Sequence, residues 1–203
     1  MALQLIRASG ALGYEPYGIT FDRKFLYVAS TTAPRIYKYD MDFNLIRTSG
    51  ILADLARGIT FDGKYLYYVT KSTKRIYKYD MDFNLISNGG GLGYDPAGLT
   101  FDGKYIYCGG AVDSDIRKYT TTFRLIRSGL NTPDQITGLT FDGKFLYSMG
   151  KNGKRVYKSD MDANTIRQTT GLAYTPQGIA FDGKYFYIGD KAGRVINKYC
   201  WYS

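Results

Sequence analysis

The chain has 203 residues, of which 44% are hydrophobic and 16% aromatic, so it holds enough apolar material for a sizeable core. It contains no histidine, and this excludes Ser-His-Asp and Cys-His catalysis and any metal site with a histidine ligand. The formal net charge of +9 favours solubility first and an acidic partner second.

One stretch of sequence occurs five times and organises the chain. Each copy starts with Gly-Ile or Gly-Leu, continues to Phe-Asp, and follows the previous copy by 40 residues without insertion or deletion. The copies begin at Gly18, Gly58, Gly98, Gly138 and Gly178. A period of this length is typical of propellers, solenoids and arrays, whose units cannot bury an apolar face alone.

The second copy illustrates the four strands that we expect in every repeat. In chain order they are residues 58–62, 64–70, 75–81 and 85–88, and we name them strands A, B, C and D. Asp62-Gly63 favours a two-residue hairpin turn, because both central positions of a type I′ turn need positive φ. Four short antiparallel strands without any helical period form the blade of a propeller. The sequence therefore predicts an all-β, five-bladed β-propeller with four antiparallel strands per blade.

The chain ends predict how the ring closes. Residues 1–10 include a copy of strand D without a strand C before it, and the last repeat ends after strand C. We expect residues 3–9 to pair with residues 195–201, which completes the last blade and leaves no edge strand open at the seam. Residues 1–203 then form a single propeller domain.

Four residue types recur at fixed positions in every copy, and we assign them structural roles. The phenylalanines, with the Ile or Leu two residues before each, are expected to pack between blades near the axis, where Phe→Ala would cost about 3–5 kcal/mol. The tyrosines of strand B are expected in the core. The aspartates form a ring that suits the turn better than a metal, with recurrent lysines as partners. The positions are Phe21, Phe61, Phe101, Phe141 and Phe181; Tyr27, Tyr67, Tyr107, Tyr147 and Tyr187; Asp22, Asp62, Asp102, Asp142 and Asp182; and Lys38, Lys78, Lys118, Lys158 and Lys198.

Two motifs resemble known propeller repeats. The run Pro96-x-Gly98-Leu99-Thr100-Phe101-Asp102-Gly103-Lys104-Tyr105-Ile106-Tyr107, followed by Ile116-x-Lys118-Tyr119, resembles NHL-type repeats, and Tyr68-Val69-Thr70-Lys71 is similar to the YVTN-type signature. The resemblance covers nearly the whole chain. It implies a propeller of a group that includes scaffolds, RNA binders, extracellular sensors, surface-layer proteins and some metal-dependent enzymes. The metal-binding histidines of those enzymes are absent here.

The repeat also predicts two unlike faces. The A–B and C–D turns lie on one rim, the turn face, and are nearly uniform in sequence. The B–C and D–A loops lie on the other rim, the loop face, and differ between copies. Because varied loops on a rigid scaffold commonly bind ligands, we place the candidate site on the loop face. Its candidate ligand-binding residues are Tyr14, Tyr17, Asp54, Arg57, Tyr94, Asp95, Asp134, Gln135, Tyr174 and Gln177.

These residue types suit a glycan or a protein partner, through stacking and hydrogen bonds. We expect a non-enzymatic binding or scaffold propeller. A first alternative is an anionic-polymer binder, with nucleic acid ranked below glycan and protein, acting through Arg7, Arg47, Arg127 and Arg167 of the outer strands. A second alternative is a structural component of a viral or cell-surface assembly, or a designed repeat protein.

Several simpler expectations complete the prediction. We expect no cofactor, no catalytic residue and no metal. Cys108 and Cys200 occupy different positions of the repeat, so free thiols are expected. Neither a signal peptide nor a transmembrane stretch is recognisable, so we expect no membrane insertion and a protein that is intracellular or virion-associated by default. We also expect a monomer.

Overall fold

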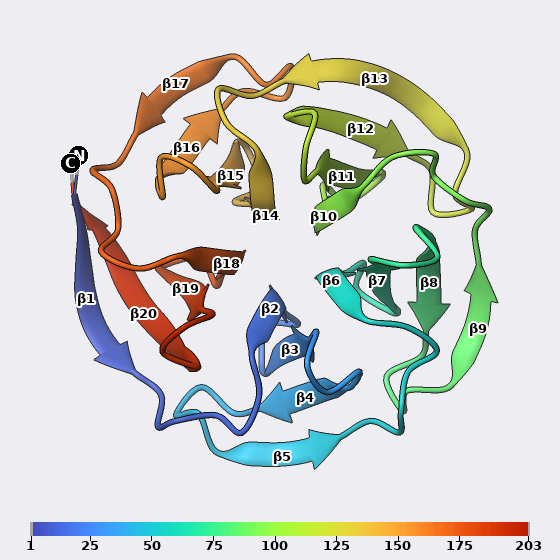
Figure 1. The fold of residues 1–203 in the computed structure, drawn as a ribbon, viewed down its shortest axis with the longest axis horizontal. Coiled ribbons are helices and arrows are strands. Elements are labelled where there is room, and N and C mark those ends of the chain that lie inside the picture. The colour runs from blue at the N-terminus through green and yellow to red at the C-terminus, as the bar shows by residue number, and fades with distance from the viewer. Residues whose placement is uncertain (1, 203) are drawn as a thin grey trace.

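A computed structural model describes residues 2–202 and shows five four-stranded antiparallel sheets arranged around a central axis (Figure 1). The innermost strands, A, are β2 (Pro16–Phe21), β6 (Ala56–Phe61), β10 (Pro96–Phe101), β14 (Ile136–Phe141) and β18 (Pro176–Phe181). Strands B are β3 (Leu26–Ser30), β7 (Leu66–Thr70), β11 (Ile106–Gly110), β15 (Leu146–Gly150) and β19 (Tyr185–Asp190). Strands C are β4 (Ile36–Tyr39), β8 (Ile76–Tyr79), β12 (Asp115–Tyr119), β16 (Val156–Ser159) and β20 (Val195–Tyr202). The outermost strands, D, are β1 (Ala2–Ala8), β5 (Leu45–Thr48), β9 (Leu85–Asn88), β13 (Leu125–Asn131) and β17 (Thr165–Gln168). The prediction of an all-β, five-bladed propeller is confirmed. No helix in the described residues is long and apolar enough to cross a membrane.

The ring closes as predicted, by pairing of the two ends of the chain. Strand β1 lies antiparallel to β20 from Ala2↔Tyr202 to Ala8↔Asn197, and Figure 1 shows the blue and red strands side by side. Ser9 extends the pairing, because its N–H donates to the Ile196 carbonyl at 2.8 Å and its Oγ accepts the Ile196 N–H at 2.9 Å. This closing pair is the longest outer pair, with strands of seven and eight residues against four in β4 and in β5.

Strand B starts two residues later than predicted in the second copy, at Leu66. The cause is the A–B turn, where Asp62 Oδ1 accepts the N–H groups of Lys64 at 2.8 Å and Tyr65 at 2.7 Å. These two backbone donors are therefore satisfied by a side chain instead of by the strand ladder. The same aspartate Oδ2 accepts the Tyr67 hydroxyl at 2.7 Å, so each turn is fastened to strand B.

The predicted Asp–Lys partnership is wrong, although the preference for a turn aspartate is borne out by these hydrogen bonds. Lys78 stands over the Tyr65 ring, with Nζ 4.0 Å from the ring centroid, and over the Tyr67 ring at 5.4 Å. The carboxylate is already occupied by two N–H groups and a phenol, and the ammonium gains a cation–π contact instead. The prediction that the strand-B tyrosines lie in the core is confirmed, because Tyr67 is fully buried.

Glycine is required where the strands A meet at the axis. A Cβ on Gly98 would lie 2.5 Å from the Leu139 nitrogen and 2.7 Å from the Gly138 Cα, both of them backbone atoms. Neighbouring strands A thus touch backbone to backbone, and the Ile or Leu after each glycine is almost fully buried beside them. The buried residues are Ile19, Ile59, Leu99, Leu139 and Ile179. The axis is therefore closed, and each face has its own depression.

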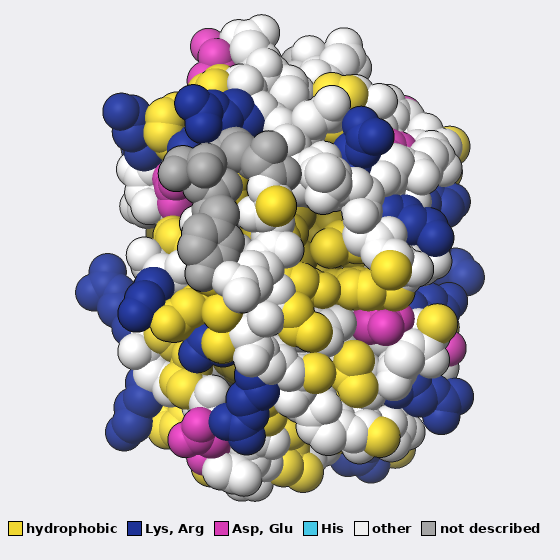
Figure 2. Space-filling view, turned by 90° about the vertical axis from the view of Figure 1, so that its left-hand side faces the viewer, with side chains coloured by type: hydrophobic (Ala, Val, Ile, Leu, Met, Phe, Trp, Pro, Cys, Tyr) yellow, Lys and Arg dark blue, Asp and Glu magenta, His cyan; other side chains and the backbone are white. Residues whose placement is uncertain are grey.

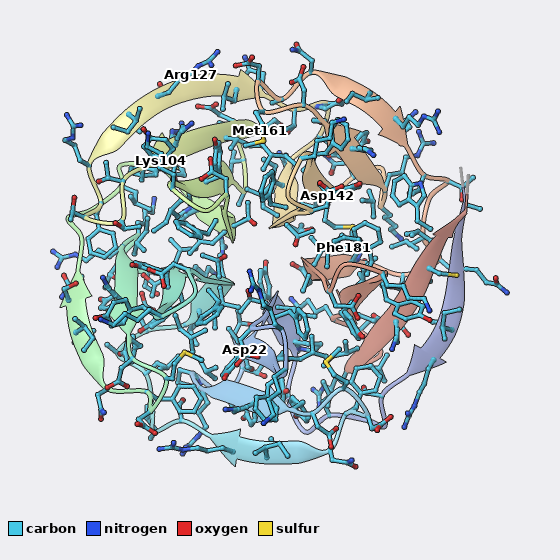
Figure 3. The ribbon with its side chains drawn as sticks, turned by 180° about the vertical axis from the view of Figure 1, so that it is seen from behind. Asp22, Lys104, Arg127, Asp142, Met161 and Phe181 are labelled. Atoms are coloured by element: carbon cyan, nitrogen blue, oxygen red, sulfur yellow. The ribbon has the colours of Figure 1, made fainter. Side chains whose placement is uncertain are left out.

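The recurrent phenylalanines pack between neighbouring blades near the axis, as the sequence predicted, but they are not sealed from solvent. Phe21 and its four equivalents are only half-buried, and with the A–B turns they line a depression of about 600 Å³ at the axis on the turn face. Figure 3 shows Phe181, Asp22 and Asp142 around this axis. The Ile and Leu residues two positions earlier form the sealed layer, so Phe→Ala should cost less than the figure given above for a buried site.

Ionisation of the strand-B tyrosines predicts alkaline destabilisation. Burial, and then the hydrogen bond to the Asp62 carboxylate, raises the pKa of Tyr67 well above 10.0, and the four equivalent tyrosines behave alike. The unfolded chain loses these protons near pH 10, while the folded protein keeps them. Their stabilising contribution is thus complete below about pH 10 and is lost as the pH rises further. We expect the denaturant midpoint to hold from about pH 7 to 9 and to fall steadily above about pH 10, with tyrosinate absorbance rising as the protein unfolds. A constant midpoint up to pH 11.5 would contradict this.

Arg23 occupies a turn position at which the other four copies have glycine. Its φ is 76°, against 99° for Gly63, and a side chain in this left-handed region costs roughly 1–2 kcal/mol. We expect Arg23→Gly to stabilise the protein by about 0.5–1 kcal/mol, since glycine also loses more chain entropy on folding. The reciprocal Gly63→Arg should destabilise it by a similar amount, and urea denaturation measures both. An Arg23→Gly variant less stable than the wild type would show that the backbone of Arg23 is not strained.

The arginines of the outer strands link neighbouring blades. Arg47 of β5 donates to the Asp82 carboxylate of the next blade at 2.8 Å, and its guanidinium lies 5.4 Å from the Phe83 ring centroid. The equivalent pairs are Arg7–Asp42 and Arg127–Asp162, with Arg127 visible on the outer rim in Figure 3. Arg167 is engaged as well. Because a carboxylate matches the charge of each paired arginine, the alternative of anionic-polymer binding through these residues finds no support in the geometry.

Apolar side chains share the outer wall with these charges. Figure 2 shows yellow hydrophobic side chains there among dark blue lysines and arginines. The outer wall includes the Leu-Ile pairs of four strands D, each about half exposed, such as Leu5 at 51% and Ile6 at 48% in β1. The short length of β5, β9 and β17, at four residues each, limits edge-to-edge pairing of the outer strands with another chain.

Candidate functional site

The varied residues of the loop face form two tiers. The outer tier, at one position of the D–A loop, consists of Tyr14, Asp54, Tyr94, Asp134 and Tyr174. The inner tier, three residues later in strand A, consists of Tyr17, Arg57, Ala97, Thr137 and Gln177. The register of strands A and B shifts at the inner tier, for example between Ala56 and Gly58, and such bulges re-aim side chains. The two tiers have different surroundings.

The outer-tier aspartates hold the loops of their own blades. Asp54 accepts the N–H groups of Ser72 at 3.1 Å and Thr73 at 2.8 Å across the B–C loop, and of Leu55 at 2.6 Å. Burial alone would raise the pKa of Asp54, but these hydrogen bonds outweigh it and keep the pKa below its usual value. Asp134 makes the equivalent bonds in the fourth blade and is 7% exposed. Both carboxylates thus serve loop structure.

The outer-tier tyrosines are packed rather than displayed. The Tyr14 ring stacks on Tyr37 at a centroid distance of 3.8 Å, and the Tyr14 and Tyr39 hydroxyls lie 2.8 Å apart. The Tyr94 ring is covered by the Arg117 guanidinium, which lies 3.7 Å from the ring centroid. Ring faces covered in this way offer no stacking platform for a sugar.

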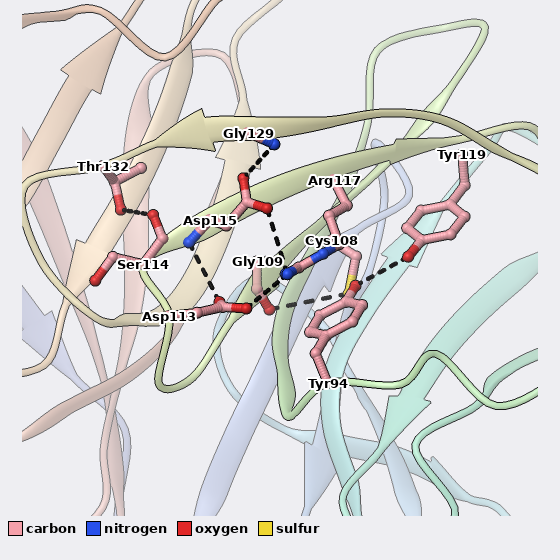
Figure 4. A network of polar contacts seen from close by, with 10 residues as sticks. All are labelled: Tyr94, Cys108, Gly109, Asp113, Ser114, Asp115, Arg117, Tyr119, Gly129 and Thr132. Atoms are coloured by element: carbon pink, nitrogen blue, oxygen red, sulfur yellow. Dashed lines mark hydrogen bonds and ion pairs between the residues drawn. The ribbon is translucent and has the colours of Figure 1, made fainter.

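Figure 4 shows that Arg117 is itself fixed by two carboxylates of the third blade. Its Nη2 lies 2.6 Å from Asp113 Oδ2 and 3.3 Å from Asp115 Oδ2, and Asp115 Oδ1 accepts the Gly129 N–H at 2.8 Å. This network ties the B–C loop to β12 and β13. The guanidinium over Tyr94 is therefore held in place from both sides, as part of the scaffold.

The inner tier surrounds a depression at the axis of the loop face, which we call the axial pocket. Its volume is about 150 Å³. It is lined by Tyr17, Arg57, Asp95, Ala111, Val112, Ile136, Thr137, Lys151 and Gln177. These residues come from all five blades, so the ring brings together side chains that are far apart in the sequence. This depression combines varied loop-face residues from every blade.

Two basic residues and one carboxylate give the axial pocket a positive balance. Arg57 Nη1 lies 3.8 Å from Asp95 Oδ2, and Asp95 Oδ1 lies 3.2 Å from Lys74 Nζ, so one carboxylate is shared by two cations. Lys151 Nζ donates to Gln135 Oε1 at 3.3 Å and forms no ion pair within the described part of the chain. The Arg57 side chain is only 12% exposed, and a charge in such a partly desolvated place acts more strongly than one in water.

Gln177 and Thr137 are the two most buried polar residues of the pocket lining. Of these, Gln177 has an unpaired side-chain atom. The residue is 5% exposed, and its Oε1 has no hydrogen-bond donor among the described residues. Buried polar atoms are nearly always paired, so an unpaired amide oxygen at the wall of a pocket is a candidate for ligand contact. The terminal amide turns readily about χ3 and can offer either its oxygen or its NH₂ group.

The structure therefore sorts the ten predicted residues. It brings Tyr17, Arg57, Asp95 and Gln177 together on the axial pocket, with Gln135 at its edge through Lys151. The five outer-tier residues lie away from the lining. Sequence reasoning did not single out Val112 or Lys151, although both belong to B–C loops that vary from copy to copy.

Metal sites and reactive thiols are two other kinds of site that residues 2–202 could hold. No group of three or more Cys, Asp or Glu side chains gathers there in a way that could hold a metal ion. Both cysteines have free thiols. Burial raises the pKa of the Cys108 thiol to about 12, which leaves it protonated and unreactive at neutral pH.

The chain is similar to several solved propellers. No family model matches it, and no curated protein matches its sequence. Glutaminyl cyclase from Myxococcus xanthus shares 13% identity at a TM-score of 0.85, over 98% of this chain and 95% of that chain. A chain of a nidogen/laminin complex shares 19% identity at 0.64, over 86% and 72%. Virginiamycin B lyase from Staphylococcus aureus shares 16% identity at 0.58, over 92% and 66%. The propeller fold is thus shown, and the finer NHL-type or YVTN-type relationship is not.

These similarities correct one prediction. The sequence led us to expect a chain that catalyses nothing, yet two of the three similar proteins are enzymes. The reasoning gave too much weight to the missing histidines and ranked catalysis by carboxylates too low, while propellers support several functions. At these identities the likeness shows the fold alone, so neither reaction is assigned to this chain. A binding or scaffold role in the general sense fits the same set of folds.

Proposed function

We propose that this chain acts as one domain that binds a protein partner through the loop face, with a short segment of the partner entering the axial pocket. The observation that carries this proposal is the inner tier. Five equivalent positions hold five different residues, and four of them (Tyr17, Arg57, Thr137 and Gln177) line one pocket, whereas the turn face repeats almost the same residues around the axis. Asymmetry at one end of a symmetric scaffold is what recognition of an asymmetric partner requires.

A peptide segment fits the site better than a glycan does. Sugar recognition relies on open aromatic faces, and the rings of Tyr14 and Tyr94 are covered by Tyr37 and Arg117. The pocket offers instead positive charge, an unpaired amide oxygen and apolar walls. Its volume of about 150 Å³ lies below the roughly 300–1,000 Å³ of sites for drug-sized ligands, which suits the entry of one residue of a longer chain.

A displayed library of random peptides tests the proposal. One half of the library carries peptides with free C-termini, and the other half carries them as internal loops. We expect selected peptides whose binding is weakened about tenfold or more by Lys151→Gln in the loop face. The matched control is Lys104→Gln, which removes the same charge from the turn face and should leave binding unchanged.

Three outcomes would refute the proposal. They are the absence of any selected peptide, binding that is insensitive to Lys151→Gln, and binding that is lost equally in Lys104→Gln. The last result would place recognition on the turn face or in non-specific charge. A glycan array that yields a ligand dependent on Lys151, with no peptide selected, would move the site to a different class of partner.

A further inference from the structure

We infer that the axial pocket receives the C-terminal carboxylate of the partner chain, together with the apolar side chain of its last residue. This inference rests on the proposed function and names the part of the partner that the pocket takes. Three features of the pocket support it: its charge, its unpaired amide and its walls. Each feature selects one chemical group of a chain terminus.

The charge selects an anion. Arg57 and Lys151 contribute two positive charges to the lining and Asp95 contributes one negative charge, which Lys74 also neutralises. An incoming carboxylate restores the balance, and a guanidinium is well shaped to donate two hydrogen bonds to it. An incoming ammonium group would meet Arg57 and Lys151 with no free carboxylate to accept it.

The amide of Gln177 selects a neighbouring N–H donor. Its Oε1 lacks a donor within the described structure, and the last residue of a peptide carries a backbone N–H two bonds from its carboxylate carbon. A chain terminus thus supplies an acceptor for Arg57 and a donor for Gln177 from one residue. A side-chain carboxylate of Asp or Glu lies farther from its own N–H and is a weaker match for this spacing.

The walls select a small apolar side chain. Val112 is 63% exposed at the pocket edge, and Ile136 also belongs to the lining. Covering this surface would remove apolar area from water. The small volume favours a last residue such as valine over a large aromatic one. Capture of a C-terminal carboxylate is one of the recurring ways in which proteins recognise peptides.

Two-dimensional NMR titration with defined dipeptides tests the inference. The probes are N-acetyl-Ala-Val with a free carboxylate, the same peptide with a C-terminal amide, and N-acetyl-Asp-amide as a side-chain carboxylate. We expect the free acid to shift the amide signals of residues around the pocket at millimolar concentration. The two other probes should bind more weakly than the free acid by a factor of about ten or more.

Two variants and one control assign the effect. Gln177→Glu keeps the size of the side chain and adds a negative charge, so it should abolish binding of the free acid. Lys151→Gln should weaken it about tenfold, and because Lys151 is exposed its loss leaves the fold intact. Lys104→Gln is the control without effect. Equal binding of acid and amide, or no shift around the pocket, would overturn the inference.

The library and the titration separate the two proposals. Selected internal loops that depend on Lys151 would leave the proposed function standing while overturning the preference for a terminus. A library that yields no peptide dependent on the loop face would overturn the proposed function, and the inference with it.

Discussion

Removal of residues 1–9 should unfold the protein or bring it close to unfolding. The deletion takes away β1, and with it the ladder that β20 uses over most of its length, from Asn197 to Tyr202. At about 1 kcal/mol for each hydrogen bond lost, the change is a large part of a typical total stability of about 5–15 kcal/mol. It also uncovers Trp201, which packs with Leu3 against the cores of the fourth and fifth blades. Circular dichroism during urea denaturation measures the loss.

A circular permutant controls for this deletion. Residues 1–9 are moved to follow residue 203 through a short linker, so that the last blade acquires its strand D in the same order as the other blades. We expect the permutant to unfold at nearly the wild-type urea concentration. A deletion variant as stable as wild type, or a permutant as unstable as the deletion, would show that β1 is not the strand that completes the ring.

Gly98→Ala should strongly destabilise the protein, although it adds only one methyl group. The added Cβ would meet the backbone of Leu139 and Gly138 at 2.5–2.7 Å, and backbone cannot turn aside as a side chain does. Overpacking in cores typically costs about 1–3 kcal/mol, and we expect this substitution to reach or exceed the upper value because two blades must separate. Differential scanning calorimetry should show a lower melting temperature.

Gly50→Ala is the matched control for this substitution. Nothing lies within 4 Å of a Cβ at Gly50, and its φ is not in the left-handed region. The same chemical change should therefore be neutral or stabilise the protein by about 0.4–1 kcal/mol through the unfolded chain. Equal effects of the two substitutions would mean that close backbone contact does not set the requirement for glycine at the axis.

The fold was predictable because the repeat defines the number of blades, the first turn of each blade and the closure of the ring. A fixed spacing gives the number of blades, the Asp-Gly pairs give the first turn, and the mismatched chain ends give the closure. Each of these features can be recognised by comparing equivalent positions of the five copies, without knowledge of contacts between distant residues. The strand bounds were less predictable, because Asp62 diverts the N–H groups of Lys64 and Tyr65 from the ladder.

The site was only partly predictable, since a repeat position does not say what covers a side chain. Tyr94 and Gln177 both vary between copies, yet the Arg117 guanidinium covers the first while the second lines the pocket. The sequence itself contains an indication of the inter-blade arginine–aspartate pairs. At the one junction where serine replaces the arginine, Ser87, the aspartate 35 residues later is replaced as well, by Thr122. A charge lost together with its partner indicates a contact.

The assignment of two faces and of the axial pocket depends on the closed ring, and one disulfide tests that closure directly. Gln4 and Cys200 are paired across β1 and β20, and opposed residues of antiparallel strands lie within the Cα separation that a disulfide spans. After oxidation, the Gln4→Cys protein should contain one intramolecular disulfide and migrate faster on a non-reducing gel as a single chain. The disulfide should fail to form when Cys200 is replaced by serine. Free thiols at both positions after oxidation, or dimers alone, would contradict a ring closed by its own two ends.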